Sequence, residues 1–398
     1  MTPEKPLRFG EFIALLALLM ATAAFSTDAM LPSMGAIGNE LSPEAPEAVA
    51  LVLTLFLLGM GVGTLFAGPL SDSFGRKRVM LGGIAIYMAA AAVAASAPTM
   101  EVLLVARAIQ GLGAAAPRVV SQALVRDLYS GRMMARVISF GFTVFSLVPA
   151  VAPLIGAWIA GVFDWRGVFW SFLVFGTISA LWLGLRQPET LPASQRRAFN
   201  SEGLWRAMRE VLGHPRVRLY LLALTFVYIT LFVWLGQVAM VFDVSFDRAA
   251  VFPMYFSLVA LLAAPSSLMN AKLVMQFGMR QMAWSAIFVL LGISTVVLVV
   301  FAGTPGPWAF WLFLGYMIVQ FSAMGFLLGN INALALEPMG HVAGMAASLV
   351  NGLATVLAAL LVMPLTAVFD GTPVPMAATV LISTILNATA MRRARHYH

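Results

Sequence analysis

The sequence predicts an all-α protein that crosses a membrane about twelve times. Hydrophobic residues make up 61% of its 398 residues, and Asp, Glu, Lys and Arg together make up only 10%. An average soluble chain carries roughly 25% charged residues, so a water-exposed globular surface is excluded. The apolar residues fall in runs of about 20 or more, the length that a helix needs to cross roughly 30 Å of hydrocarbon. These spans leave no room for a soluble catalytic domain, and we expect no enzyme.

Breaks in the apolar runs at charged residues, Gly and Pro set the predicted spans. They cover residues 11–37, 48–71, 78–97, 99–127, 133–162, 166–187, 217–242, 250–274, 280–302, 307–336, 341–369 and 372–391. The longest polar stretch, Gln187–Pro215, separates two sets of six spans. We therefore expect an N-terminal bundle at residues 1–187, a cytoplasmic linker at 188–215 and a C-terminal bundle at 216–398. Charged residues interleave in the linker with Trp205, Met208, Val211 and Leu212, which predicts an amphipathic helix on the inner leaflet.

The placement of Lys and Arg predicts the orientation of the chain. One set of connections and tails holds Lys5, Arg8, Arg76, Lys77, Arg78, Arg126, Arg132, Arg136, Arg196, Arg197, Arg206, Arg209, Arg216, Arg218, Lys272, Arg280, Arg392, Arg393 and Arg395. The opposite loops hold only Arg166 and Arg248, together with several acids. Both termini are therefore expected in the cytoplasm, in a multi-pass protein of the plasma membrane, which in bacteria is the inner membrane.

The N-terminal segment also admits a second interpretation. Lys5 and Arg8, a short apolar stretch and the small residues around Ala21 are typical of a secretory signal and its cleavage site. Cleavage would leave eleven spans with the N-terminus outside. The apolar run continues to about Ile37, which is too long for the core of a signal and favours a first span.

Several function classes are excluded by composition. The net charge of +7 is scattered between apolar runs rather than gathered on one face, so no nucleic-acid partner is expected. Cysteine is absent from the sequence, which excludes disulfides and thiolate metal sites. The four histidines, His214, His341, His396 and His398, fall in predicted loops or the tail, so we expect no metal. Because no G-x-x-x-x-G-K-[ST] loop is present, the sequence supports neither a nucleotide cofactor nor ATP as the energy source.

The two halves of the sequence echo each other. A Phe-Gly-x-basic loop follows the second predicted span of each half, at residues 74–77 and 277–280. Leu70 and Leu273 fall in the same register. A parallel repeat of six plus six spans is the architecture of many secondary transporters, whose substrate site lies between the halves.

The sharpest motif is GPLSDSFGRKR at residues 68–78, between the second and third predicted spans. Gly75 permits a tight turn, and Asp72 can pair with Arg76 or face a helix N-terminus. A positive-inside anchor would explain the basic residues but not Gly68, Asp72 and Gly75. The segment resembles the signature loop of the major facilitator superfamily, G-x-L-x-D-x-x-G-R-[KR]. The resemblance implies the major facilitator fold of two pseudo-symmetric six-helix bundles, and it implies that Gly68, Asp72, Gly75 and Arg76 latch the cytoplasmic side.

Asp28 and Arg107 are the ionisable residues predicted to lie deepest in the membrane. Each such residue costs about 2.5 to 3.5 kcal/mol on insertion scales and needs an explanation. At 1.5 Å per residue, Asp28 lies about 13 Å from the outer end of its span and Arg107 about 12 Å, so the two could pair. Pairing favours an ionised Asp28 and burial opposes it, which suits a proton-coupling carboxylate. The alternatives are a helix cap for Asp28 and snorkelling for Arg107.

Residues 103–115, LLVARAIQGLGAA, resemble the fourth-span motif of the superfamily, in which the Arg is linked to proton transfer. Their small residues also allow close helix packing. Arg118 lies 11 residues beyond Arg107, about three turns away on the same face, and we interpret it as snorkelling to the inner surface.

Residues 149–157, PAVAPLIGA, resemble the antiporter signature G-x-x-x-G-P-x-x-G-G. Pro153 and Gly156 match it, Pro149 adds a second proline, and Ala152 and Ala157 replace glycines. A kinked helix of small residues is the alternative. Residues 28–32, DAMLP, and residues 270–274, NAKLV, with Phe277-Gly278, resemble the bicyclomycin and chloramphenicol resistance (Bcr/CflA) branch of twelve-span drug:proton antiporters.

Four residues are candidates for a drug site. Tyr228 and Phe232 lie one helical turn apart, and Gln237 and Asn332 are polar groups in otherwise apolar spans. Aromatic walls with a few hydrogen-bonding groups suit varied lipophilic ligands, and the 24 Met residues could supply adaptable contacts. Ordinary packing or lipid contact is the alternative for each.

The resemblance implies a secondary active transporter that exports lipophilic drugs or antibacterials in exchange for protons, by alternating access. Its expected partners are the lipid bilayer, a small lipophilic substrate and protons, and we expect a monomer without cofactors. A proton-linked symporter that imports a small metabolite on the same fold remains an alternative, and so does a membrane-embedded enzyme or lipid flippase.

Overall fold

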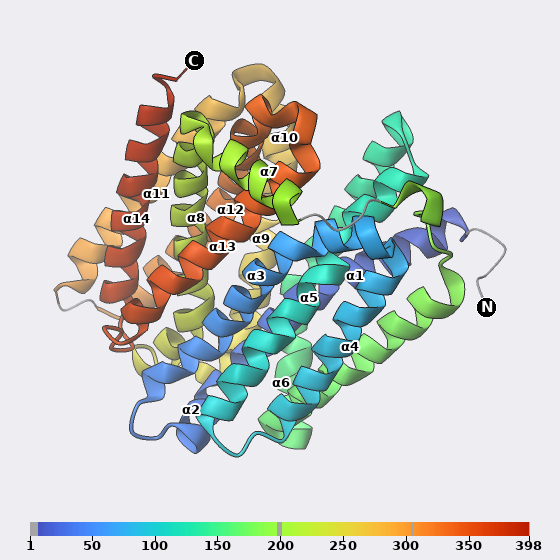
Figure 1. Cartoon of the computed structure of the whole chain (residues 1–398). Coiled ribbons are helices and arrows are strands. Elements are labelled where there is room, and N and C mark those ends of the chain that lie inside the picture. Colours follow the sequence, from blue (N-terminus) through green and yellow to red (C-terminus); the bar gives the residue numbers. More distant parts are fainter. Residues whose placement is uncertain (1–6, 197–200, 304–305, 398) are drawn as a thin grey trace. The chain divides into compact units, whose positions relative to one another are not determined.

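The computed structural model describes residues 7–196, 201–303 and 306–397, and every regular element in these ranges is helical (Figure 1). The α-helices are α1 (Phe9–Asp28), α2 (Met34–Leu41), α3 (Ala50–Phe74), α4 (Arg76–Ala95), α5 (Met100–Leu128), α6 (Gly131–Arg186), α7 (Ser201–Gly213), α8 (Pro215–Val244), α9 (Phe252–Ala263), α10 (Pro265–Phe277), α11 (Met279–Phe301), α12 (Ala309–Leu336), α13 (Ala343–Thr366) and α14 (Pro373–Ala394). The all-α prediction is confirmed.

Within the described ranges, 11 helical segments are long and apolar enough to cross a membrane. The first runs from Phe9 to Leu41 through the short 3-10 turn η1 (Leu31–Ser33), and another joins α9 to α10 across Ala264. The number is one fewer than the twelve predicted, because the predicted fifth and sixth spans both lie in the single 56-residue helix α6.

A break inside α6 restores the predicted number of spans. Asp164 has φ 64° and ψ 176°, which no helix contains. Before the break, Gly156 lies against Ala29 near the end of α1, and after it Arg186 pairs with Glu11 near the start of α1. The chain therefore reverses direction at the break, and α6 consists of two antiparallel spans, 131–162 and 165–186.

The described residues form two compact units. Unit 1 is Met1–Ser33 with Leu55–Ala207, and unit 2 is Met34–Thr54 with Met208–His398. Helix α2 belongs to unit 2 because it packs near α8, where Gly35 approaches Asp243. This grouping follows packing rather than connectivity, so the division at residues 187 and 216 stays a prediction.

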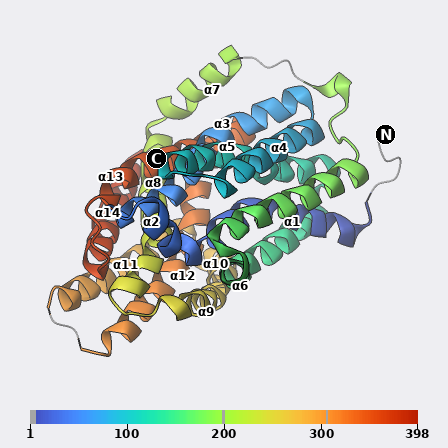
Figure 2. The same ribbon diagram turned by 90° about the horizontal axis from the view of Figure 1, so that it is seen from below.

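In unit 1, helix α5 contacts α3 and α4 through their backbones, and Figures 1 and 2 show the three helices side by side. A Cβ atom on Gly111 would lie 1.9 Å from the carbonyl oxygen of Phe56 in α3. One on Gly113 would lie 2.5 Å from the backbone nitrogen of Tyr87 in α4. Only glycine allows helices to approach this closely, which confirms the packing role predicted for the fourth span.

In unit 2, aromatic rings fill the space around α8. The Trp234 ring stacks on Phe313 at 5.4 Å between centroids and meets Tyr316 edge-on at 5.0 Å. Phe242 makes similar edge contacts with Phe252 and Phe310. These rings are buried, and they hold α9 and α12 against α8.

The predicted linker helix is present as α7. Val211 is fully buried, whereas the Trp205 side chain is 51% exposed. The helix therefore has a covered side and an open side, as an amphipathic segment requires. Its position on a membrane surface stays a prediction, and residues 197–200 lie outside the described ranges.

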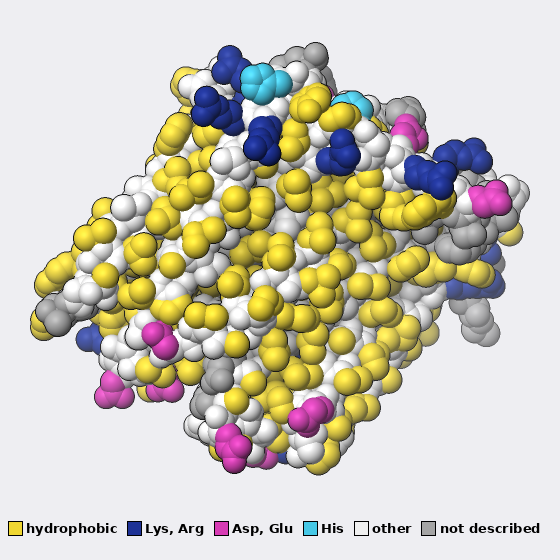
Figure 3. Space-filling view, turned by 60° about the vertical axis from the view of Figure 1, so that its left-hand side comes forward, with side chains coloured by type: hydrophobic (Ala, Val, Ile, Leu, Met, Phe, Trp, Pro, Cys, Tyr) yellow, Lys and Arg dark blue, Asp and Glu magenta, His cyan; other side chains and the backbone are white. Residues whose placement is uncertain are grey.

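Apolar side chains also cover much of the outer surface, as Figure 3 shows for one face, where charged side chains lie mainly at the margins. Leu185, Phe288 and Val299 are all more than 60% exposed. A contiguous apolar surface of this kind is suited to lipid rather than water.

The echo of the two halves is present in the backbone. Gly75 (φ 99°, ψ 149°) precedes α4, and Gly278 (φ 81°, ψ 155°) precedes α11. Only glycine adopts this region of backbone space at low cost. The charges do not repeat, because Met275 and Met279 stand in unit 2 where unit 1 has Asp72 and Arg76.

Replacement of Gly278 by Ala is expected to lower the free energy of unfolding by about 1 to 3 kcal/mol, the typical cost of a strained backbone conformation. No atom lies within 4 Å of the position of a Cβ at Gly278, so crowding makes no contribution. Gly292→Ala, in the middle of α11 and also without a neighbour within 4 Å, is the control and should be neutral or slightly stabilising. Thermal unfolding of both variants in detergent measures the difference, and equal midpoints would contradict the assignment.

Candidate functional site

Arg107 on α5 is the most deeply buried charge of unit 1, with no exposed surface. Its guanidinium donates to the Gln110 side chain at 2.6 Å and to the carbonyl oxygen of Ser26 at 3.3 Å. It also lies over the Phe56 ring, 4.2 Å from the centroid. Hydrogen bonds and the ring face offset the cost of burying the charge. A snorkelling role is excluded, because the side chain does not reach the surface.

Asp28 is the last residue of α1 and is 5% exposed. Its carboxylate accepts a hydrogen bond from the Thr27 hydroxyl at 3.0 Å. In the described structure the Asp28 and Arg107 side chains form no ion pair, so the direct pairing that their equal depth allows stays a prediction. Arg107 instead binds the backbone at Ser26, two residues before Asp28. The two charges therefore share a region and are connected through α1.

Ser26 also connects this region to α4. Its hydroxyl donates to the carbonyl oxygen of Thr22 at 2.7 Å and lies 2.6 Å from the Tyr87 hydroxyl. Because the Ser26 proton is already used, Tyr87 is the donor in the second bond. Sequence reasoning missed Ser26, Tyr87 and Gln110. The position of Gln110, three residues after Arg107 on the same face, was a usable signal, and no local pattern marked Tyr87.

The helix that resembles the antiporter signature packs directly behind Asp28. A Cβ atom on Gly156 would lie 1.8 Å from the carbonyl oxygen of Ala29, so the two backbones touch. Pro153 is buried and Pro149 half-buried, and both lie inside α6. The three residues thus belong to the segment of α6 that lies against the end of α1.

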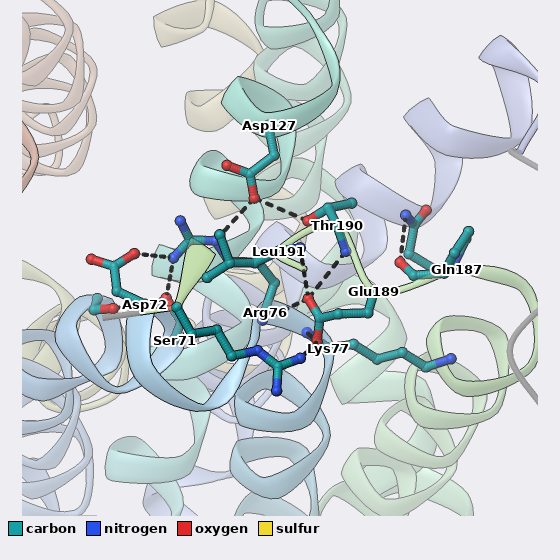
Figure 4. Close-up of polar contacts among 12 residues, drawn as sticks. Ser71, Asp72, Arg76, Lys77, Asp127, Gln187, Glu189, Thr190 and Leu191 are labelled. Carbon is teal, nitrogen blue, oxygen red and sulfur yellow. Dashed lines mark hydrogen bonds and ion pairs between the residues drawn. The ribbon is translucent and has the colours of Figure 1, made fainter. Parts of the chain in front are cut away.

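The predicted latch residues form an ionic cluster at the turn between α3 and α4 (Figure 4). The Arg76 guanidinium binds the Asp72 carboxylate and the Ser71 hydroxyl, and its Nε donates to Asp127 at the end of α5 at 3.0 Å. The pairing of Asp72 with Arg76 is as the motif predicted. Gly68 accepts a hydrogen bond from the Ser71 hydroxyl at 2.8 Å.

Glu189, which follows α6, completes this cluster and was missed from the sequence. Its carboxylate accepts the backbone N–H groups of Arg76 at 2.9 Å and Lys77 at 3.2 Å, the first two residues of α4 (Figure 4). A carboxylate at a helix N-terminus satisfies free N–H groups and the helix dipole. A Cβ atom on Gly75 would lie 2.4 Å from this carboxylate, so glycine is required there for space as well as for its φ.

The same carboxylate also orders its own segment. Glu189 accepts the backbone N–H groups of Thr190 and Leu191, and the Thr190 hydroxyl donates to Asp127 at 2.9 Å. Glu189 and Asp127 therefore connect the beginning of the linker to Arg76 of the predicted latch. Neither acid belongs to the signature loop, and both reach it from other parts of unit 1.

The candidate drug-site residues lie in unit 2, and three of the four come together. The Tyr228 hydroxyl donates to Asn351 at 3.2 Å, and Asn351 donates to Asn332 at 3.0 Å. The Phe232 ring stacks on Tyr228 with centroids 5.7 Å apart. Gln237 lies nine residues beyond Tyr228, half a turn round the helix, and so faces another direction.

Arg118 is half-buried, and its guanidinium contacts the sulfur of Met60 at 3.2 Å. It is therefore less buried than Arg107, and its snorkelling to the inner surface stays a prediction. Within the described ranges, no group of three or more His, Asp or Glu side chains could hold a metal ion.

Comparison with known proteins identifies the family of the chain. The family model described as Major Facilitator Superfamily matches residues 14–363. A bicyclomycin resistance protein homolog of Haemophilus influenzae is 33% identical over 280 residues, 68% of each chain. A chloramphenicol resistance protein of Pseudomonas aeruginosa is 38% identical over 170 residues, which cover 42% of this chain and 40% of the relative. The solved xylose transporter of E. coli shares the fold, with a TM-score of 0.73, 14% identity and 96% of each chain covered.

Replacement of Gly156 by Ala is expected to destabilise unit 1 by about 1 to 3 kcal/mol, because an added methyl group must displace the backbone at Ala29. Gly161→Ala, one turn and a half further along α6 with nothing within 4 Å, is the matched control and should change little. Thermal unfolding measures both variants. A Gly156→Ala protein as stable as the control would show that α1 and α6 are not in contact here.

Replacement of Glu189 by Gln is expected to cost about 1 kcal/mol of stability, because a neutral amide is a weaker acceptor for the first N–H groups of α4. Glu11→Gln is the control, since Glu11 pairs with Arg186, as Glu189 pairs with Arg196, but caps no N–H group of α4. The unfolding midpoint of each variant, measured at low and moderate salt, checks this. An equal shift in both variants would mean that only a surface charge had been lost.

Proposed function

We propose that this chain, which belongs to the Major Facilitator Superfamily and to its bicyclomycin and chloramphenicol resistance branch, exports lipophilic antibacterials in exchange for protons. The chain is a multi-pass membrane transporter rather than an enzyme. The proposed location is the bacterial inner membrane with both termini in the cytoplasm, as the Lys and Arg placement predicts. The proposed working form is a monomer that needs no cofactor.

The observation that carries this proposal is the buried carboxylate of Asp28 next to the buried guanidinium network of Arg107. Ionisable groups inside a membrane are costly, and they usually mark ion or proton pathways. Arg107 has acceptors in Gln110 and Ser26 that do not depend on Asp28, so its position is secured in either state of the carboxyl group. Asp28, whose carboxylate is bound by the Thr27 hydroxyl, can thus gain or lose a proton without displacing Arg107.

The proposed cycle uses this pair as the coupling element. A proton from outside neutralises Asp28, and its electrostatic attraction to Arg107 is lost. The end of α1 is then held less strongly, drug affinity falls, and the drug leaves outward while the proton continues inward. Each charge that crosses is worth about 2.3 kcal/mol per 100 mV of membrane potential, which is enough to drive accumulation gradients.

The ionic cluster around Arg76 is the proposed conformational latch. Gly68, Asp72, Gly75 and Arg76 would hold the cytoplasmic end of unit 1 in one arrangement while the cavity faces outward. Asp127 and Glu189 extend this latch to α5 and to the linker. In unit 2, the connected group of Tyr228, Phe232 and Asn332 is the proposed wall of the drug site. Gln237, on another face of α8, is a second proposed point of contact with the drug.

Replacement of Asp28 by Asn should reduce proton-driven drug export by about tenfold or more, a loss within the usual range of coupling between sites. Asp247→Asn is the control, because Asp247 is exposed at a helix end and Asn tolerates its φ of 52°. Chloramphenicol transport and a pH-sensitive dye are followed together in inverted vesicles with an imposed proton gradient. Full proton-driven export by the Asp28→Asn protein would refute the coupling role.

Two measurements separate export from the alternative of proton-linked import. In the inverted vesicles, an exporter accumulates drug inside as protons leave. In intact cells, a symporter moves substrate and proton inward together, so substrate addition would make the external medium more alkaline.

A further inference from the structure

Three of the buried, uncharged polar side chains in unit 2 that have atoms without a hydrogen-bond partner lie on α8 and α12. Trp234 and Gln320 are at most 1% exposed, and Gln237 is 3% exposed. In the described part of the chain, no protein group binds the Trp234 Nε1, the Gln237 Oε1 or either polar atom of the Gln320 amide. Buried polar groups in folded proteins are nearly always hydrogen-bonded, so these atoms call for a partner.

Each of the three side chains belongs to, or lies one helical turn from, a single group of packed aromatic rings. Gln237 lies one turn beyond Trp234 on α8. Gln320 lies one turn beyond Tyr316 on α12, and Tyr316 meets the Trp234 ring at 5.0 Å. The ring of Phe321, the residue after Gln320, also contacts the Trp234 ring, with centroids 6.2 Å apart. We name Trp234, Gln237 and Gln320 the Trp234 cluster.

The Tyr316 hydroxyl does not serve the cluster. Tyr316 lies one turn before Gln320 on α12, and its hydroxyl is already hydrogen-bonded to Ser294 of α11 at 3.0 Å. The cluster therefore presents one donor on Trp234, one acceptor on Gln237, and one of each on Gln320. The rings of Phe313 and Phe321 form the apolar wall beside the Trp234 ring.

Acidic side chains are absent from the helix interiors of the C-terminal half. Beyond the linker helix, all acids of the C-terminal half stand at or beyond helix ends: Asp243, Asp247, Glu337 and Asp370. A cation bound at the cluster would be buried without a counter-charge, which is costly. The cluster is suited to an uncharged molecule that offers a donor, an acceptor and a flat apolar group.

We propose that the Trp234 cluster is a recognition site for uncharged, hydrogen-bonding aromatic compounds and that it prefers them to lipophilic cations. The proposal names a substrate class for the proposed export function and rests on that function. It adds Trp234 and Gln320 to the residues that recognise substrate, and it gives Gln237 a different set of neighbours from Tyr228.

Equilibrium binding to the full chain in lipid nanodiscs tests this proposal without a proton gradient. Chloramphenicol is the probe, since it carries an aromatic ring, hydroxyl groups and an amide but no charge, and tetraphenylphosphonium is the cationic probe. Gln237→Leu, Gln320→Leu and Trp234→Phe should each weaken chloramphenicol binding about five- to tenfold, the usual worth of one hydrogen bond. Tetraphenylphosphonium binding should change by less than about twofold, because a cation makes no such bonds.

Gln276→Leu, an exposed glutamine at the end of α10, is the matched control and should bind both probes as the unchanged protein does. Trp234→Phe keeps the ring and removes only the N–H donor, so it remains informative if a leucine variant fails to fold. If water alone serves the cluster, the variants bind chloramphenicol normally and the proposal is overturned. Equal losses for both probes, or tighter binding of the cation by the unchanged protein, overturn it as well.

Failure of the export proposal is distinguishable from failure of this one. A protein that binds chloramphenicol through the Trp234 cluster but shows no proton-driven transport retains the recognition site and refutes the antiport mechanism. A protein that exports drug under an imposed gradient, with unchanged binding in the Gln237→Leu and Gln320→Leu variants, refutes the recognition site alone.

Discussion

The burial of the Arg107 guanidinium is the constraint on which unit 1 depends. A charge with no exposed surface must find acceptors inside the protein, and Arg107 finds them in Gln110 and in the backbone of Ser26. These contacts require α1 and α5 to stay close at this level. The glycines of α5 fix its other neighbours, since Gly111 and Gly113 bring the backbones of α3 and α4 into direct contact with α5.

The same constraint fixes the surroundings of Asp28. The end of α1 is bound by α5 at the Ser26 carbonyl, by α4 at the Ser26 hydroxyl, and by α6 at Ala29. A change of charge at Asp28 therefore acts on a segment that touches three helices. In a core packed this closely, a small local shift is passed on as a rearrangement of helices rather than absorbed.

Local patterns made the spans and the latch predictable, because hydropathy, Gly75 and the Asp72–Arg76 spacing are properties of short segments. The partners Asp127, Glu189 and Tyr87 were not predictable, since each reaches its site from a distant segment. Depth along a helix placed Asp28 and Arg107 at the same level, but depth does not fix the direction of a side chain around the axis. For that reason equal depth does not by itself give an ion pair, and the guanidinium of Arg107 binds the backbone at Ser26 in this structure.

The two halves share a backbone plan and differ in chemistry. Gly75 and Gly278 adopt the same conformation, yet the latch charges and the mid-span charges all lie in unit 1. If unit 2 recognises uncharged molecules, one proton exchanged for one molecule carries a net charge inward. Membrane potential and pH gradient then both drive export, whereas exchange of one proton for a cation would be electroneutral and use the pH gradient alone. Neutral recognition in unit 2 would thus make the proposed coupling carboxylate, Asp28 of unit 1, more effective.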